Sequence, residues 1–506
     1  MGRWRHVVRI GPPKRAMPPR PFALLTPGYR AVTVETVAGK FHFRGPKRCY
    51  SAISRLEGHA VYVNGSITAL RHTTGAKSWH GATWRGRATS MSLDGTTVVV
   101  QSLRGALEGS PTPFGELATA MAWFEAHGVR AGSMSGMGWA LWRSTLTRDV
   151  VIAARPALGR AGLYGGRQEV RNHLDGNGNP RELSHMVAVD ITGAYPHAMA
   201  SAPYATGLRR VDRSTPLDPT VPGMVEATVG VDADMPYRPL PLRLAADMIV
   251  FPHGYVTGIW PWCEVAAALD LGCSVKVSKC WAPTGLDHLF GPDWSAAIAE
   301  ARTLSPAAAR IVKTAANSTW GMFGMRGDQR ESLRWTDEAG LQPLRVPLAE
   351  VPLPHASTCH VAAETSARVR VRMLREGLYG EFASPVHVDT DGIIVRRSSV
   401  RGLPTSSSPG EWRAKTTMAR VDIRAPQVYR YTCGKGCGIA HAKYHYVTAG
   451  TPPDLARALF ERMGDTGGWV SGNGIDIVLP TGSANDRAGL LSSARSARSE
   501  IGRMTA

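Results

Sequence analysis

Two aspartates interrupt an apolar run at residues 386–395, which reads VHVDTDGIIV. Its Val and Ile residues favour a buried strand. Alternate side chains of a strand share a face, so His387, Asp389 and Asp391 are expected together, although Asp391-Gly392 also fits a hairpin tip. Two carboxylates this close repel unless a cation such as Mg²⁺ lies beside them. Taken alone, a D-x-D motif more often marks a solvated turn.

Two further segments carry residues that suit a nucleoside triphosphate. VAVDITGAYPHAM places Asp190 at the end of a second apolar strand, with Tyr195 five residues later. RIVKTAANSTWGMFG is helical, and Lys313 and Asn317 lie one turn apart on one face, with Arg310 close to it. Cations hold phosphates, and carboxylates hold metal ions that stabilise an in-line displacement. The combination favours a Mg²⁺-dependent nucleotide site.

Charge and cysteine usage narrow the class of protein. The chain has 506 residues and a formal net charge of +19, which suits a polyanionic partner such as nucleic acid, although a basic but ordinary surface is the alternative. Seven scattered Cys favour a reducing cytosol over a disulfide framework. The basic N-terminus has no apolar signal region and no run of 18 apolar residues occurs, so we expect a cytoplasmic protein without a membrane segment.

Three motifs resemble those of family B DNA polymerases and occur in that family's order. DITGAYPH resembles motif A, KTAANSTWG motif B and HVDTDG motif C. Flanking segments are similar to the protein-primed branch of phages and linear plasmids: LYGGRQE to its link between exonuclease and polymerase domains, and residues 239–272 to its insertion between motifs A and B. The resemblance covers approximately residues 155–450.

The resemblance implies a two-metal nucleotidyltransferase site. Asp190 and Asp391 would bind two Mg²⁺ ions, with Mn²⁺ as the alternative, the Ile191 backbone carbonyl as a further ligand and Asp389 as an accessory carboxylate. Tyr195 would close against the sugar 2′ position and exclude ribonucleotides. The triphosphate would be held by Lys313 with Arg310 and Arg302, while Asn317 would shape the pocket of the nascent base pair.

DNA contacts are implied outside the three motifs. The residues concerned lie in the link and in the primer-gripping region: Tyr164, Gly165, Gly166, Arg167, Tyr429 and Lys443. Several positions depart from the family pattern. Trp320 replaces Tyr in motif B, His387 and Gly392 replace Tyr and Ser in motif C, and Gln427 replaces the lysine of the K-x-Y motif.

The N-terminal region resembles a 3′–5′ exonuclease that has lost its carboxylates. Glu35 remains in TVETV, but Thr33 and Thr68 stand where aspartates are expected, and Glu116 is interpreted as a remnant of the third motif. A two-metal nuclease needs those carboxylates, so we predict that proofreading is lost and that the domain is kept as a scaffold or as a wall that binds single-stranded DNA. Glu35 as a plain surface residue is the alternative.

A zinc site at residues 433–445 is the less favoured of two interpretations of the sequence there. Two Cys and two His near the C-terminus are spaced at four-residue intervals: Cys433, Cys437, His441 and His445. Two Cys with two His can hold a zinc ion. The spacing is not that of a standard zinc finger, and the intervening glycines favour a plain hairpin turn.

The predicted fold is α/β (α+β), a right-hand polymerase with palm, fingers and thumb behind an N-terminal RNase H-like exonuclease domain. The expected divisions are a basic irregular arm (1–30), the exonuclease-like domain (31–155), a first palm segment with the priming-type insertion (156–290), fingers (291–325), a second palm segment (326–400), thumb (401–485) and a basic tail (486–506).

The function predicted from the sequence is template-directed DNA synthesis in phage or plasmid replication. The expected partners are a DNA primer-template, dNTPs and a terminal priming protein, and the chain is expected to be a monomer. The sequence leaves open whether priming uses a protein, an RNA or nothing. A catalytically weak or inactive DNA-binding protein of the same fold is one alternative, and a D-x-D glycosyltransferase is a remote one.

Overall fold

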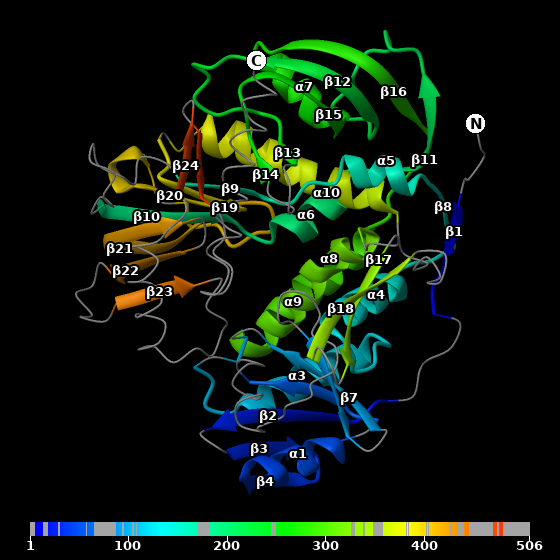
Figure 1. Ribbon diagram of the computed structural model, residues 1–506, viewed down its shortest axis with the longest axis vertical. Coiled ribbons are helices and arrows are strands. Elements are labelled where there is room, and N and C mark those ends of the chain that lie inside the picture. Colours follow the sequence, from blue (N-terminus) through cyan, green and yellow to red (C-terminus); the bar gives the residue numbers. More distant parts are fainter. Residues whose placement is uncertain are drawn as a thin grey trace.

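The computed structural model of the protein describes most of the chain up to residue 444 and two short strands beyond it. The described residues are 6–13, 19–28, 31–56, 58–64, 88–93, 96–103, 106–107, 109–170, 183–243, 249–324, 329–336, 340–347, 358–380, 382, 384–400, 402, 404–425, 428–433, 440–444, 469–472 and 475–478. Three large sheets follow one another along the long axis, with helices between them (Figure 1). Within the described residues, no helix is long and apolar enough to cross a membrane.

The N-terminal sheet lies at one end of the molecule and has the strand order β4-β3-β2-β5-β7-β6. Its strands are β2 (Phe22–Gly28), β3 (Ala31–Thr36), β4 (Gly39–Arg44), β5 (Ala60–Val63), β6 (Ala88–Leu93) and β7 (Thr96–Ser102). Because strand side chains alternate, Ala23 and Leu25 face helix α1 (Pro46–Ser54), while Leu24 joins the main core on the opposite face.

The prediction of an irregular arm over residues 1–30 is wrong. β1 (His6–Ile10) pairs with β8 (Val150–Ala154), and β2 is an interior strand of the N-terminal sheet. Leu24 and Leu25 are fully buried there. The sequence FALLTPG shows no alternation of apolar and polar residues, because both faces of β2 are buried, and its Pro and Gly favour a turn.

The upper sheet has the order β1-β8-β11-β16-β12-β15 and lies at the other end. Its remaining strands are β11 (Tyr204–Val211), β12 (Met224–Val231), β15 (Gly254–Pro261) and β16 (Ser274–Asp287). Two short strands, β13 (Leu242–Arg243) and β14 (Ile249–Val250), form a separate pair, and helix α7 (Trp262–Asp270) packs into the same apolar cluster as the sheet.

The central sheet brings the strand of Asp190 next to the hairpin of Asp389 and Asp391, in the order β23-β22-β21-β10-β20-β19-β9. Its strands are β9 (Arg167–Val170), β10 (Leu183–Ile191), β19 (His387–Thr390), β20 (Gly392–Arg396), β21 (Trp412–Ala425), β22 (Val428–Cys433) and β23 (Ala440–Tyr444). Since β21 to β23 extend the sheet of β10, the division expected at residue 401 falls between strands of one sheet. The domain boundaries stay predictions.

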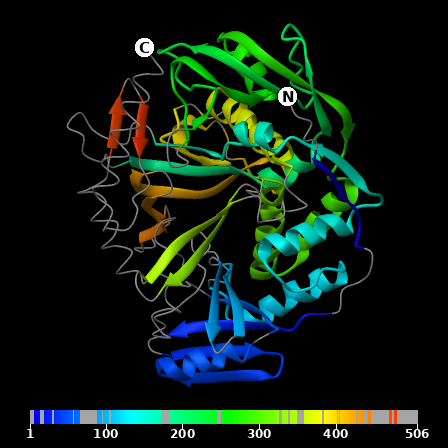
Figure 2. The same ribbon diagram turned by 45° about the vertical axis from the view of Figure 1, so that its right-hand side comes forward.

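Helices fill the space between the sheets. They are α3 (Pro113–Ala126), α4 (Met134–Ser144), α5 (Pro156–Ala161), α6 (Ala194–Ala200), α8 (Pro292–Glu300), α9 (Pro306–Phe323) and α10 (Cys359–Arg372), which continues as a π-helix over Met373–Leu378. Both views show α8 and α9 between the N-terminal and central sheets, with the hairpin β17 (Gln329–Thr336) and β18 (Gly340–Pro347) beside them (Figures 1 and 2). Ser as N-cap and Pro at the first helical position are the expected helix-start chemistry, and α9 begins at Pro306 after Ser305.

One core cluster joins the helices to two of the sheets. It runs from Leu24 in the N-terminal sheet through Trp142 and Phe323 to Val189 in the central sheet. Helices α4 and α9 cross so closely that a Cβ added at Gly138 would lie 2.0 Å from the Ala315 carbonyl oxygen. The helix that carries Lys313 is therefore held firmly against the N-terminal region of the chain.

Candidate nucleotide and metal site

The strand ends of β10 and β20 bring two distant aspartates together. Asp190 pairs in register with Gly392, and the Ile191 amide donates to the Asp391 carbonyl oxygen at 2.8 Å. A Cβ added at Gly392 would lie 3.3 Å from the Asp190 Cβ. Glycine at this position of motif C therefore leaves room for Asp190 at the neighbouring strand end.

A tight turn separates Asp389 from Asp391. The Asp391 amide donates to the Asp389 carbonyl oxygen at 2.7 Å, and Thr390 between them has φ +63°. A β-branched residue rarely adopts this conformation, so the turn stores backbone strain. The hairpin tip is therefore the correct alternative, and the prediction that His387, Asp389 and Asp391 share one strand face is wrong because the strand ends at Thr390. His387 instead packs edge-on against Tyr429, with ring centroids 5.2 Å apart.

The electrostatics of the two carboxylates differ. Burial raises the pKa of Asp391 to about 6; the Lys415 ammonium lowers it, and the charges of Asp190 and Asp389 raise it. Asp190 is 3% exposed. Its Oδ2 pairs with Lys415 Nζ at 2.5 Å, while its Oδ1 has no hydrogen-bond partner among the described residues. A buried carboxylate oxygen without a donor suits a cation ligand.

Lys415 is a site residue that sequence reasoning missed. It lies on β21 where the register with β10 shifts, since Thr416 opposes Ala188 while Ala414 opposes Val189. A β-bulge of this kind re-aims one side chain. No local sequence signal marks it, because the bulge exists only in the pairing of two strands more than 200 residues apart.

Helix α9 carries Lys313, which interacts electrostatically with Asp391 and Asp190, and Asn317 one turn further along. Lys313 is an exposed residue, but the protein around its ammonium group excludes some water, and this desolvation lowers its pKa. The Lys415 and Arg413 charges lower the pKa of Lys313 further, while the Asp391 and Asp190 charges raise it. Asn317 is half-buried, and its Oδ1 has no partner within the described residues. The two side chains that the sequence assigns to the nucleotide thus lie on the helix next to the aspartates.

Tyr195 and Trp320 form the wall between motif A and helix α9. Their rings stack with centroids 5.0 Å apart and planes inclined by 19°, and Tyr195 is 8% exposed. Trp320 is the residue that departs from motif B, and the larger ring gives Tyr195 a broad apolar partner. Burial raises the pKa of Tyr195 well above its ordinary value, so its hydroxyl stays neutral.

The two arginines expected to assist Lys313 lie apart from each other. Arg302 Nη1 donates to the Ser407 carbonyl oxygen at 2.5 Å, and burial and the Arg413 charge lower its pKa. Gly193, at the start of α6, lies close to the Arg302 guanidinium. Arg310 Nε instead donates to the Ala106 carbonyl oxygen at 2.9 Å and ties α9 to the N-terminal region of the chain. Its expected role at the triphosphate has no support from this geometry.

The link residues pack inside the protein. Tyr164 and Arg167 are 4% and 1% exposed, and Arg167 pairs with Glu169 at 2.9 Å. Direct DNA contact by these two side chains is therefore corrected to a packing role. A Cβ added at Gly166 would lie within 2.6 Å of the Thr390 side chain, so this glycine lets the link approach the motif C turn.

The two residues expected to contact DNA near the C-terminus differ in their position in the sheet. Tyr429 is 8% exposed and packs on His387 and Tyr431, so its ring is part of the sheet's core cluster. Lys443 lies on the outermost strand β23, opposite Tyr429, and its role stays a prediction. Gln427 lies outside the described residues.

The zinc hypothesis is only partly covered by the structure. Cys433 ends β22 and His441 lies on β23, and these strands pair antiparallel, which confirms the expected hairpin. Cys437 and His445 lie outside the described residues, so zinc binding is untested.

The exonuclease-like residues have structural partners. Glu35 pairs with Lys40 across the β3–β4 hairpin at 3.2 Å, and Thr33 Oγ1 shares a hydrogen bond with His42 Nδ1 at 3.1 Å. Strand β2, which separates β3 from the parallel strand β5, has the sequence FALLTPG without any acidic residue. Thr68 lies outside the described residues.

Glu116 caps a helix and is not placed as a nuclease ligand. Its Oε2 accepts hydrogen bonds from the Ser305 hydroxyl and, at 3.1 Å, from the Ala308 amide in the first turn of α9. Ser305 is the N-cap residue, as its sequence predicts, but its hydroxyl does not cap the helix. A carboxylate from α3 thus satisfies the helix N-terminus and complements its dipole.

Glu116→Ala is therefore expected to destabilise the protein by about 1–2 kcal/mol, because the Ala308 amide loses its acceptor. Urea unfolding would measure the change. Glu125→Ala, on an exposed position of the same helix α3, is the matched control and is expected to change stability by less than about 0.5 kcal/mol. Equal effects of the two substitutions would contradict the capping role.

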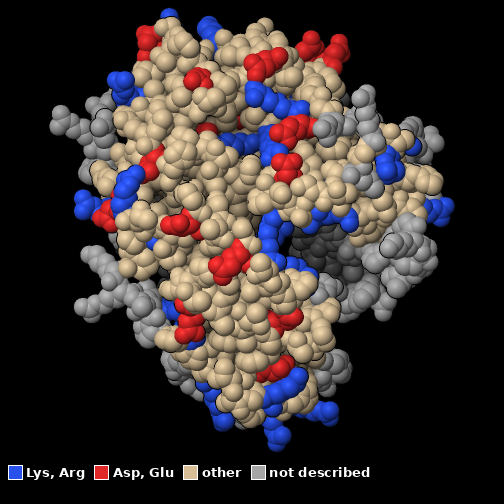
Figure 3. All heavy atoms as spheres, turned by 180° about the vertical axis from the view of Figure 1, so that it is seen from behind, with Lys and Arg blue, Asp and Glu red and all other residues tan. Residues whose placement is uncertain are grey.

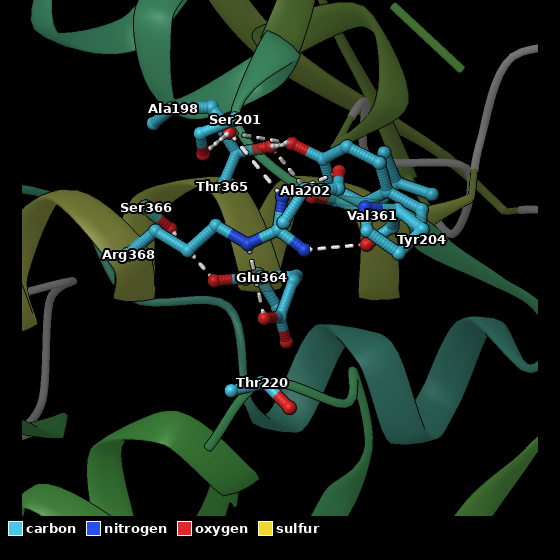
Figure 4. Close-up of polar contacts among 12 residues, drawn as sticks. Ala198, Ser201, Ala202, Tyr204, Thr220, Val361, Glu364, Thr365, Ser366 and Arg368 are labelled. Carbon is cyan, nitrogen blue, oxygen red and sulfur yellow. Dashed lines mark hydrogen bonds and ion pairs between the residues drawn. The ribbon is translucent and has the colours of Figure 1, made fainter. Parts of the chain in front are cut away.

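A partly buried arginine fixes the helix that follows Asp190. Arg368 on α10 donates to the carbonyl oxygens of Ala198, Ala202 and Pro203, at and beyond the end of α6, and pairs with Glu364 at 3.2 Å (Figure 4). Its guanidinium lies 4.3 Å from the centre of the Tyr204 ring. A cation at the carbonyl end of a helix stabilises it, so Arg368 positions α6 and Tyr195 without touching the site.

The two carboxylates suit metal ions whose coordination is completed by a bound substrate. The described residues contain no group of three or more His, Cys, Asp or Glu side chains able to hold a metal ion on their own. Asp190 and Asp391 supply two carboxylates, and Mg²⁺ usually keeps waters and takes phosphate oxygens besides one or two carboxylates. Figure 3 shows Lys and Arg side chains along the upper and left edges of a hollow on the back of the molecule.

Comparison with known proteins assigns the fold. No protein-family model matches the sequence, and no curated protein matches it. Phi29 DNA polymerase complexed with primer-template DNA and incoming nucleotides superposes with a TM-score of 0.58 over 92% of this chain and 99% of that chain, at 11% identity. This chain has the fold of Phi29 DNA polymerase. The orthorhombic form of Phi29 DNA polymerase gives a TM-score of 0.60 at 10% identity, over 91% and 99% of the two chains. Its complex with single-stranded DNA gives 0.60 at 11%, with the same coverage.

Proposed function

We propose that this protein is a template-directed DNA polymerase that adds deoxynucleotides to a primer 3′-hydroxyl. The observation that carries the proposal is the meeting of Asp190 and Asp391 at adjacent strand ends beside Lys313. The fold, shared with a polymerase solved with primer-template DNA, supports a DNA partner. The Lys and Arg side chains along one side of the hollow in Figure 3 suit a polyanionic partner.

We assign the subdomains of the polymerase as follows. The central sheet with α6 and α10 is the palm, α8 and α9 are the fingers, and the sheet with β2 to β7 is an exonuclease-like domain without proofreading. The last assignment rests on β2, which lacks carboxylates, and on Glu116, which is engaged at α9.

In this proposal the chain's own residues bind and orient the reactants. Asp190 and Asp391 would hold two Mg²⁺ ions, which when bound activate the attacking hydroxyl and stabilise charge on the phosphates. Lys313 would neutralise the triphosphate, and Tyr195, backed by Trp320, would contact the sugar and exclude a 2′-hydroxyl. The 3′-hydroxyl oxygen attacks the α-phosphorus, and pyrophosphate leaves.

A primer-extension assay tests the proposal. Purified protein with Mg²⁺ and dNTPs is expected to extend a primed template, and a bare template in a parallel reaction tests whether a primer is needed. Failure on both templates, with a folded protein that still binds DNA, would favour a non-catalytic DNA-binding protein. The ion pair between Lys415 and Asp190 is the observation that favours this second candidate. Nothing in the fold supports the glycosyltransferase alternative.

Lys313→Met is expected to lower kcat/KM for dNTP incorporation by about 10²-fold or more, because a charge facing the phosphates is lost. Most of the loss should appear as a raised KM for the dNTP. Steady-state extension kinetics would measure it. Lys276→Met, at an exposed lysine in the upper sheet, is the control and should leave both constants unchanged. A Lys313 variant with wild-type KM would refute the triphosphate role.

A further inference from the structure

Lys415 forms an ion pair with Asp190, the carboxylate that the proposed function assigns to a metal ion. Its Nζ lies 2.5 Å from Asp190 Oδ2, and the side chains are 49% and 4% exposed. Lys415 thus reaches in from solvent to a buried acid. The bulge between β10 and β21 aims the side chain there, and Thr416 and Ala414 on either side keep their pairing with β10.

The charges around the site already balance. Asp391 interacts electrostatically with Asp190, Asp389, Lys415 and Lys313, and Lys313 also interacts with Arg413. These groups are three carboxylates and three cations, so their formal charges cancel. Two divalent ions alone would leave roughly four uncompensated positive charges, whereas two ions with a fully ionised nucleoside triphosphate add about none. The site is therefore electrostatically suited to take metal and triphosphate together.

We propose that Lys415 is a built-in counter-ion of Asp190, which holds the acid in the absence of nucleotide and leaves it when a metal–triphosphate complex enters. The proposal rests on the proposed function, since it assumes that Asp190 is a metal ligand. Lys415 is a positioning residue in this role. Its solvent-exposed stem lets the ammonium swing away without moving the strand, and the phosphates offer it a new partner.

Metal binding in the absence and presence of nucleotide tests this inference directly. Mn²⁺ binding would be followed by electron paramagnetic resonance of the free ion, for wild type, Lys415→Gln and Asp190→Asn. Without nucleotide, wild type should bind Mn²⁺ weakly, and Lys415→Gln should bind it about tenfold more tightly or better, because the competing ammonium is gone. With a non-hydrolysable dNTP analogue, the difference between the two should shrink to about twofold or less, because the phosphates already draw the ammonium away. Asp190→Asn should lose the binding in both conditions.

The control is a lysine in a comparable ion pair elsewhere. Lys279 on β16 pairs with Glu226 on β12 at 2.8 Å, with exposures of 42% and 25%. Lys279→Gln should bind Mn²⁺ as wild type does. An unchanged Mn²⁺ affinity in Lys415→Gln, with nucleotide-dependent binding intact, would overturn the inference and leave the polymerase proposal standing. Absence of Mn²⁺ and nucleotide binding in every folded variant would overturn both.

Discussion

Asp391→Asn and Asp190→Asn are each expected to reduce primer extension by about 10³-fold or more, equivalent to roughly 4 kcal/mol of transition-state stabilisation. Asp190 and Asp391 lie at adjacent strand ends, and the described residues contain no group of three or more His, Cys, Asp or Glu side chains that could hold a metal ion. The amide keeps the shape of the side chain but removes its charge. Single-turnover extension of a primed template would measure the loss.

The neighbouring carboxylate provides the internal comparison. Asp389→Asn lies across the turn from Asp391 and is expected to reduce extension by less than about 10²-fold, since an accessory carboxylate acts through charge alone. Asp270→Asn, on helix α7, should leave extension unchanged. A wild-type rate of primer extension in Asp391→Asn would refute the two-metal proposal, independently of the results for the other variants.

The same Asp391→Asn substitution is expected to stabilise the metal-free protein at neutral pH. The pKa of Asp391 is raised from 3.8 to about 6, so the folded state binds the proton more tightly than the unfolded state. The contribution of this group to stability is therefore full below pH 4 and is lost as the pH rises through 6. Asparagine never ionises, so the variant should gain up to about 3 kcal/mol at pH 7.5 and almost nothing at pH 4. Urea unfolding in chelator at both pH values would measure this; a larger gain at pH 4 would contradict it.

Glu264→Gln is expected to destabilise the protein by about 3–5 kcal/mol, because it leaves a buried arginine without its counter-charge. Arg370 on α10 makes two hydrogen bonds to Glu264 on α7, at 2.7 and 2.9 Å, and the two side chains are 2% and 1% exposed. Arg370 also donates to the carbonyl oxygens of Tyr164 and Gly165. The substitution should therefore loosen the link as well as the contact between α7 and α10.

A surface pair on the same two elements serves as the control. Asp270, at the end of α7, pairs with Arg375 in the π-helical continuation of α10, and both side chains are substantially exposed. Asp270→Asn is expected to change stability by less than about 1 kcal/mol, because water screens an exposed pair. The midpoints of urea unfolding would compare the two variants. Similar losses in both would mean that burial does not set the strength of the Arg370–Glu264 pair.

Local patterns in the sequence were sufficient for the elements that carry the site. The apolar run before Asp190 predicts β10, the Asp391-Gly392 pair allows the hairpin tip, and Pro306 begins α9 as expected. Each of these features depends on residues within a few positions of one another. Alternation, turn chemistry and helix-start chemistry act over that range, so the sequence alone contains the information.

The residues that sequence reasoning missed or misread depend on contacts between distant segments. Lys415 meets Asp190 only through the register shift of β21, and Glu116 caps α9 across 189 positions of chain from Ser305. Tyr164 and Arg167 were expected at the DNA, but neighbouring elements bury them.

By itself the sequence determined the candidate residues for the site, namely two aspartates at the ends of apolar strands and a lysine on a helix face. Only the tertiary structure decided that a second lysine already holds one of those aspartates and that the N-terminal region supports the helix. Strand register, burial and capping between elements are properties of non-local packing, and no local pattern in the chain specifies them.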